Sequence, residues 1–141
     1  MAEPSRPQVP VKPGFFTIPT DSATPPQFLG TRCKDCSEHF YPSRAICAKC
    51  LSENTESVSM DGRGTLYSYT FVYFPMFGTS IVEFADGYGV GLVDLAAGPR
   101  LQMPLGGKQD EFRIGQDMVA ELTKMREDGD NDVMIVRFRP A

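Results

Sequence analysis

Hydrophobic and polar residues alternate in short runs through the second half of the chain. Met134, Val136 and Phe138 lie two residues apart, with Arg137 and Arg139 between and after them, where they would face water. A period of two is typical of strands that bury one face. Glycine, proline and aspartate separate the runs, and we therefore predict five strands, at about 64–74, 88–95, 100–105, 117–125 and 133–139.

The segments between these runs suit short connections. The acidic stretch from Glu127 to Asp132 is rich in aspartate, asparagine and glycine and predicts a hairpin turn. Residues 108–114 predict a single helical turn, and no long helix is expected. Five strands, the first long enough to bend around a barrel corner, match the strand count of an OB-fold. We predict a mostly β protein with a five-stranded OB-fold barrel in residues 61–141.

The first 30 residues contain seven of the twelve prolines. Proline fixes φ and has no backbone N–H, which excludes a long helix or a central strand. We predict an extended arm over residues 1–30, with a flexible tail as the alternative. Phe15, Phe16 and Ile18 are the apolar residues that this arm could bury against a surface.

Four cysteines dominate residues 31–60. Cys33 and Cys36 form one C-x-x-C pair, Cys47 and Cys50 form another, and ten residues separate the pairs. Two such turns can direct four sulfurs at one ion, with no open position, and we predict a structural zinc site. A piece of about 30 residues has too little core to fold alone, so the metal must stabilise it. Mononuclear iron fits the same sulfurs, whereas His39 is expected to be an exposed hairpin residue.

The composition excludes several classes of function. The formal charge is −4 and the pI near 4.9, which counts against nucleic acid as the main partner. No stretch approaches the roughly 20 apolar residues that span a bilayer, the N-terminus lacks a signal-peptide pattern, and we expect a cytoplasmic protein. With one histidine, all thiols committed to metal and no nucleophile motif, no catalysis is expected from the chain alone.

An unusual aromatic run follows residue 66. Strict alternation would place Tyr67, Tyr69, Phe71 and Tyr73 on one side of a strand, and we expect two of them in the barrel core. Four aligned aromatics could instead form a stacking platform for the bases of a single-stranded nucleic acid, or a protein contact.

The loop from Pro75 to Asp86 is rich in large apolar residues that need cover. We predict that a partner subunit covers them together with the arm, through five contact residues: Phe15, Phe16, Met76, Phe77 and Ile81.

An ordered series of motifs resembles a known family. It consists of Cys33-Lys34-Asp35-Cys36, Tyr41-Pro42-Ser43-Arg44, Cys47-Ala48-Lys49-Cys50, Gly62-Arg63-Gly64-Thr65-Leu66-Tyr67-Ser68-Tyr69-Thr70, Gly91-Leu92-Val93-Asp94-Leu95 with Gly98, and Ile114-Gly115. Over about residues 28–139 the chain looks like members of a former domain of unknown function, which join a rubredoxin-like zinc ribbon to an OB-fold. Ser37 and Leu51 stand where such proteins commonly have glycine or another small residue after each cysteine pair.

The resemblance implies a role in acyl-CoA metabolism. Such proteins are typically assembled with thiolase-like enzymes, as in acetoacetyl-CoA thiolase complexes, steroid side-chain aldolases and benzoylsuccinyl-CoA thiolase. The implied role is a non-catalytic subunit that holds the enzyme and helps bind the CoA moiety, with a hydratase or retro-aldolase as an alternative partner. The cations that could meet the CoA phosphates are Arg32, Lys34, Arg44, Lys49 and Arg63, with Lys108 and Arg113 as further candidates.

Overall fold

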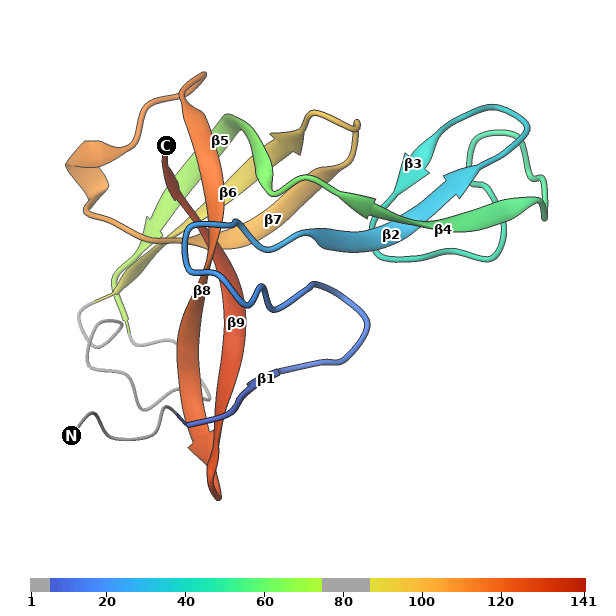
Figure 1. The fold of residues 1–141 in the computed structure, drawn as a ribbon. Helices are drawn as coiled ribbons and strands as arrows, with labels where there is room; N and C mark the ends of the chain where they lie inside the picture. Colours follow the sequence, from blue (N-terminus) through green and yellow to red (C-terminus); the bar gives the residue numbers. More distant parts are fainter. Residues whose placement is uncertain (1–5, 75–86) are drawn as a thin grey trace.

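A computed structural model describes residues 6–74 and 87–141, and its strands form two sheets (Figure 1). The larger sheet contains the five predicted barrel strands: β5 (Arg63–Val72), β6 (Tyr88–Leu95), β7 (Arg100–Leu105), β8 (Asp117–Asp128) and β9 (Asn131–Pro140). Their order is β9-β7-β6-β5-β8, and the pairing of β8 with β9 closes the barrel. The prediction of a mostly β protein with an OB-fold barrel is confirmed, and β6 and β7 have the predicted bounds.

The barrel core follows the predicted alternation in part. Val136 and Phe138 of β9 pack in one core with Met118 and Ala120 of β8. Met134 is also buried, but so is the adjacent Val133, and neither belongs to that core cluster. The two strands join through a tight turn at Gly129, where φ is +58°. The 3₁₀ turn η2 (Gln109–Glu111) occupies the segment for which one helical turn was predicted.

Arg137 departs from the expectation that it faces water. Its Nε donates to Glu121 Oε1 at 2.8 Å, and only 15% of its side chain is exposed. Arg139, which pairs with the second oxygen of Glu121 at 3.1 Å, is about half exposed. The ion pair with Glu121 therefore holds Arg137 against the barrel surface, whereas Arg139 stays more exposed.

The cysteine-containing segment forms the smaller sheet, which projects from the barrel (Figure 1). It contains β2 (Phe28–Cys33), β3 (His39–Phe40) and β4 (Thr55–Met60), with β2 in the centre and both neighbours antiparallel to it. The predicted boundary at residues 60 and 61 lies between β4 and β5, whereas β2 begins three residues before the predicted start of the ribbon.

Phe28 joins the ribbon to the barrel. Its side chain is fully buried, it stacks on Phe138 with ring centroids 5.6 Å apart, and the edge of Tyr41 meets it at 5.3 Å. Met60, which pairs with Phe28 across β2 and β4, belongs to the same core. The base of the ribbon is thus part of the barrel core and fixes the direction in which the ribbon projects.

The N-terminal arm is extended, as its prolines predict. Its strand β1 (Gln8–Pro10) adds to the barrel sheet parallel to β9, and Phe16 forms an isolated bridge with Phe28. Only 8% of Phe16 is exposed, so this predicted partner contact is buried in the chain's own core. Phe15 packs partly against that core, with its ring edge-on to Tyr41 at 6.2 Å.

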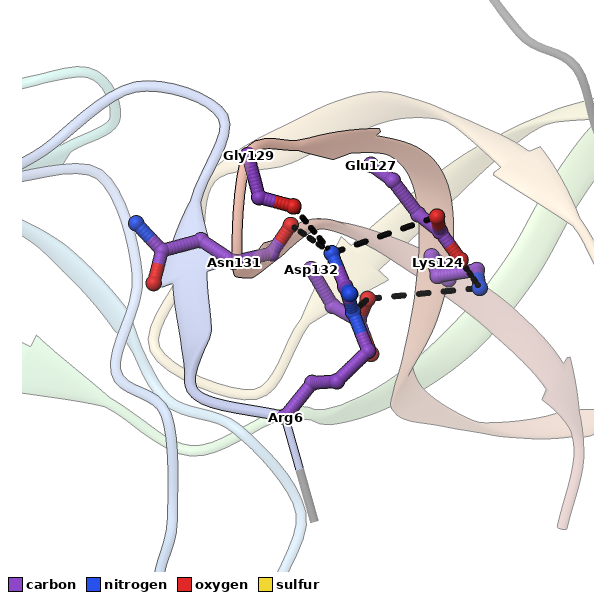
Figure 2. A network of polar contacts seen from close by, with 6 residues as sticks. All are labelled: Arg6, Lys124, Glu127, Gly129, Asn131 and Asp132. Carbon is purple, nitrogen blue, oxygen red and sulfur yellow. Dashed lines mark hydrogen bonds and ion pairs between the residues drawn. The ribbon is translucent and has the colours of Figure 1, made fainter. Parts of the chain in front are cut away.

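Arg6 fastens the start of the arm to the β8–β9 hairpin (Figure 2). Its Nε donates to Asp132 Oδ1 at 2.7 Å, and Nη2 donates to the carbonyl oxygen of Gly129 at 2.6 Å. Lys124 donates to Glu127 at 2.9 Å, and this hydrogen bond is the main reason that the pKa of Glu127 is lowered. The network holds the arm at the point where it begins to run beside β9.

Replacing Arg6 with alanine should loosen the arm without unfolding the barrel. The variant loses the charge-assisted hydrogen bonds to the hairpin, and backbone bonds at the edge of a sheet then open more often. The amides of Val11 and Asp132, which donate across the β1–β9 seam at 2.9 and 2.8 Å, should exchange hydrogen several-fold faster. Arg126→Ala, on the same hairpin but outside the drawn network, is the matched control. Equal exchange in both variants would show that Arg6 does not hold the arm.

Candidate metal centre

The four cysteine sulfurs meet at one point in the ribbon. All four Sγ atoms lie within 4.8 Å of one another. The Cys33 and Cys50 sulfurs are 3.6 Å apart, and those of Cys36 and Cys47 are 3.5 Å apart. A tetrahedral site with Zn–S bonds of about 2.3 Å has sulfur–sulfur edges of about 3.8 Å. The cysteines therefore fit a zinc ion, and within residues 6–74 and 87–141 they are the one cluster with metal-ligand composition.

Two equivalent turns place the sulfurs. In each turn the residue after the second cysteine donates its N–H to the carbonyl oxygen of the first: Ser37 to Cys33 at 2.9 Å, and Leu51 to Cys47 at 3.0 Å. Both donors have a left-handed backbone, with φ of 67° and 64°. Glycine adopts this conformation at the lowest cost. The two positions noted for lacking glycine are thus the two that need a positive φ.

The surroundings of the sulfurs shift the pKa values of Cys47 and Cys50 in opposite directions. Burial disfavours charge on Cys47, but the N–H groups of Cys50 and Lys49 point at its sulfur from 3.4 and 3.3 Å, and the pKa of Cys47 is lowered to about 7. Cys50 has the opposite shift. Its sulfur receives a favourable backbone hydrogen bond from Ser52, but the neighbouring Cys33 sulfur and burial raise the pKa of Cys50 to about 12. A divalent cation at the centre would remove this conflict by neutralising adjacent thiolates.

A polar link ties the first turn to the segment after the second. Asp35, between Cys33 and Cys36, accepts hydrogen bonds from the hydroxyl of Ser52 and from the side-chain amide of Asn54. These hydrogen bonds lower the pKa of Asp35, that from Ser52 contributing most. Ser52 in turn accepts the N–H of Asn54 at 3.0 Å. The link fixes the distance between the two halves of the metal site.

His39 lies outside the sulfur cluster, on β3, where it pairs with Arg32 in the register of β2. Its side chain is half-buried and does not share the exposure expected of a hairpin tip.

The predicted CoA-binding cations do not form one cluster. Arg32 pairs with Glu56 at 3.1 Å, and Lys49 pairs with Glu38 at 3.3 Å. Arg44 lies over the Phe40 ring at 5.6 Å. These three and Lys34 belong to the ribbon, whereas Arg63 belongs to the barrel.

Arg63 lies apart from the other predicted cations. It pairs with Asp61 at 3.4 Å and lines a groove of about 590 Å³ between residues 19–26 of the arm and strands β8 and β9.

The aromatic run does not form a flat stacking platform. A β-bulge between Leu66 and Ser68 breaks the alternation, so Leu66 is buried and Tyr67 is half exposed. Arg100 covers the Tyr67 ring at 3.4 Å from the centroid. Tyr69 packs against the core and against Phe112. The prediction that four aromatics share one side is wrong, because the bulge inserts one residue into the strand.

The apolar loop predicted to contact a partner, with Met76, Phe77 and Ile81, lies outside the described residues. No helix in the described part of the chain is long and apolar enough to cross a membrane.

Comparisons with known proteins cover both sheets. Residues 20–56 match the family described as ChsH2, rubredoxin-like zinc ribbon domain, and residues 57–123 match ChsH2, C-terminal OB-fold domain. A DUF35 domain-containing scaffold protein of Methanothermobacter thermautotrophicus is 30% identical over 78% of this chain and 82% of that protein. The benzoylsuccinyl-CoA thiolase subunit BbsA of Geobacter metallireducens is 29% identical over 84% of this chain and 77% of its own.

Solved structures have the same architecture. The Ltp2-ChsH2(DUF35) aldolase matches with a TM-score of 0.63 and 29% identity over 81% of this chain and 84% of that one. A DUF35-family protein of unknown function from Sulfolobus solfataricus shares the fold, with a TM-score of 0.52, 18% identity, and coverage of 82% of this chain and 76% of that one.

Changing Cys47 to serine should remove both the metal and the folded ribbon. Three sulfurs and a weak oxygen leave an incomplete shell, and the wild-type chain should hold about one zinc ion. Metal analysis of the purified proteins measures the content and distinguishes zinc from iron. His39→Ala is the control and should keep the metal. A folded wild-type ribbon without metal would contradict the zinc assignment.

Changing Asp35 to alanine should speed the loss of zinc without changing the ligands. The variant removes the link to Ser52 and Asn54, so the two cysteine turns separate more readily. We expect zinc transfer to a chromogenic chelator to become a few-fold faster. Glu53→Ala removes a neighbouring carboxylate that lies outside the hydrogen-bonded link and should leave the rate unchanged. If both variants release zinc at the wild-type rate, Asp35 does not hold the site together.

Proposed function

Since the chain belongs to the DUF35 family, in which a ChsH2-type rubredoxin-like zinc ribbon precedes an OB-fold domain, we propose that it is a non-catalytic accessory subunit of a thiolase-type acyl-CoA enzyme. The observation that carries the proposal is its likeness to BbsA over 77% and 85% of two BbsA chains, a protein named as a subunit of benzoylsuccinyl-CoA thiolase. Likeness to proteins named as scaffolds supports the same role.

The chemistry of the chain supports a role in assembly. Its four thiols all lie at the metal centre, where they would be thiolate ligands rather than nucleophiles. The one histidine, His39, lies on β3, outside the cysteine cluster. Acyl transfer would therefore take place on the partner, and this chain would supply binding surface.

A contact with the CoA moiety is a finer part of the proposal. Arg32, Lys49 and Arg63 already pair with carboxylates of the same chain. Lys34 and Arg44 therefore have more of their charge available for a phosphate group, and both are exposed on the ribbon. We assign the phosphate contact to these two residues.

A partner from another class of acyl-CoA enzyme has its own support. The probable enoyl-CoA hydratase alpha subunit of Thermomonospora curvata is 31% identical over 78% of this chain, although the match covers only 32% of that longer protein. The Ltp2-ChsH2(DUF35) structure is titled an aldolase. The test of function therefore includes hydratase and aldolase subunits beside thiolases.

Co-expression with an enzyme subunit from the same genome tests the proposal. The tagged chain should co-purify with a thiolase-type subunit as a complex of fixed stoichiometry, measured by size-exclusion chromatography with light scattering. The isolated chain should turn over no acyl-CoA ester, because it offers no free thiol. Turnover by the isolated, pure chain would contradict the non-catalytic role. Failure to bind thiolase, aldolase and hydratase subunits alike would contradict the accessory role.

The phosphate contact is tested separately in the assembled complex. Lys34→Ala with Arg44→Ala should raise the KM for the acyl-CoA several-fold and leave kcat nearly unchanged, because a uniform binding contact is lost. Arg126→Ala with Arg139→Ala, two exposed cations of the barrel strands β8 and β9, serves as the charge-matched control. Equal KM values in the two double variants would show that Lys34 and Arg44 do not contact CoA. The proposed role in assembly would be unaffected by that result.

A further inference from the structure

Leu51 combines a costly backbone conformation with an exposed apolar side chain. Its φ of 64° lies in the left-handed region, which is unfavourable for any residue that has a Cβ atom. Of its surface, 76% is exposed to water. Glycine would satisfy the same turn at lower cost, so folding of the isolated chain gives no reason for a leucine here.

The equivalent position of the other turn is used differently. Ser37 has nearly the same φ, 67°, but its hydroxyl accepts a hydrogen bond from Arg32 at 2.9 Å. The side chain at that position therefore stabilises the ribbon itself. Leu51 makes no such polar contact, because its side chain has no polar atom, and most of it extends into solvent. A strained residue whose surroundings do not use its side chain indicates a function outside the chain.

A second aliphatic residue lies beside it. Ile46 immediately precedes Cys47 and is 48% exposed. The N–H of Cys47 donates to the carbonyl oxygen of Ser52 at 2.9 Å, which holds residues 46–47 next to residues 51–52. The exposed Ala48 lies within the same turn. We call Ile46, Ala48 and Leu51 the apolar tip of the ribbon.

The shape and the charge of the surroundings indicate what covers this tip. The ribbon projects from the barrel (Figure 1), and residues 46–51 lie in the connection from β3 to β4, which enters β4 at the end opposite its barrel-facing base. Such a projecting segment can enter a concave surface. Asp35 accepts a hydrogen bond from Ser52, next to Leu51, and Glu53 follows. Lys49, inside the same turn, pairs with Glu38 at 3.3 Å, so charges of both signs surround the tip. Membranes and nucleic acids attract a basic patch, which this surface lacks, whereas a protein pocket with an apolar floor and a rim of both charges matches it.

We propose that the apolar tip inserts into such a pocket on the partner acyl-CoA enzyme subunit and anchors the complex. This inference rests on the proposed accessory function. The metal site would hold the tip in its bound conformation before contact, so binding costs little conformational entropy. One or two buried aliphatic anchors surrounded by polar residues are a common arrangement at the centre of an interface.

The test compares glycine at the two left-handed positions. Leu51→Gly should weaken binding to the purified enzyme subunit that co-purifies with the wild-type chain by about tenfold or more, the usual effect of losing one buried leucine. Isothermal titration or biolayer interferometry measures the change. Ser37→Gly, which relieves the same backbone conformation on the other turn, should bind within about twofold of the wild type. Both variants should keep full zinc content. Leu51→Gly should melt at or above the wild-type temperature, and Ser37→Gly close to it, because the relieved backbone offsets the lost hydrogen bond from Arg32.

Ile46→Ser supplies a second variant in case glycine at position 51 disturbs the turn. It should weaken binding severalfold with the zinc content unchanged. Wild-type affinity in both Leu51→Gly and Ile46→Ser would overturn the anchor, as would an equal loss of affinity in Ser37→Gly. If the wild-type chain binds no acyl-CoA enzyme subunit at all, the proposed function fails before the anchor is tested. The two failures are therefore distinguishable.

Discussion

The four-sulfur centre is the interaction on which the ribbon depends. Between residues 32 and 59, Cys33 and Cys47 are the buried residues, so this segment has almost no apolar core of its own. The ribbon sheet is small: its strands have six, two and six residues. It cannot bury enough surface to offset the conformational entropy that the chain loses on folding. A structural zinc ion supplies roughly 10–16 kcal/mol of apparent binding free energy, which is enough to replace the missing core. A zinc ion bound by the four cysteines would thus be a folding element, and the rest of the ribbon would be free to carry polar and apolar surface.

The barrel is stabilised by an apolar core, and Phe28 connects this core to the ribbon. This residue starts the ribbon's central strand but stacks on Phe138, the last buried residue of the final barrel strand. Phe16 of the arm bridges to the same residue. Three parts of the chain that differ in composition therefore meet at Phe28, the arm through a backbone bridge and the barrel through a stacked ring. The proposed accessory role needs contact surfaces in fixed relative positions, and the packing around Phe28 fixes the ribbon relative to the barrel.

The sequence was most informative where one physical rule acts locally. Two-residue cysteine spacing predicts a turn that directs two sulfurs at one point, and alternation of apolar residues predicts a strand. The fold class, the strands and the meeting of the four cysteines therefore followed from the printed residues. The sequence was least informative where contacts between distant parts of the chain determine the position of a side chain. The bulge before Ser68 inserts one residue and moves Tyr67 to the opposite face from Tyr69, which alternation cannot anticipate. The hydrogen bonds of Asp35 link segments 17 and 19 residues apart, and no local pattern marks them.

Phe16 shows why exposed and buried apolar residues are hard to separate from a single sequence. A phenylalanine in a proline-rich arm has the same hydrophobicity whether it meets a partner or its own barrel, and here the bridge to Phe28 places it inside the chain's core. Leu51 is the opposite case, because it follows a metal-binding cysteine in a segment that offers it no core. The backbone angle separates the two residues: Phe16 extends into a strand bridge, whereas Leu51 keeps a conformation that only a smaller residue adopts without cost. For a non-catalytic subunit, the residues of functional interest are those for which the isolated fold has no use.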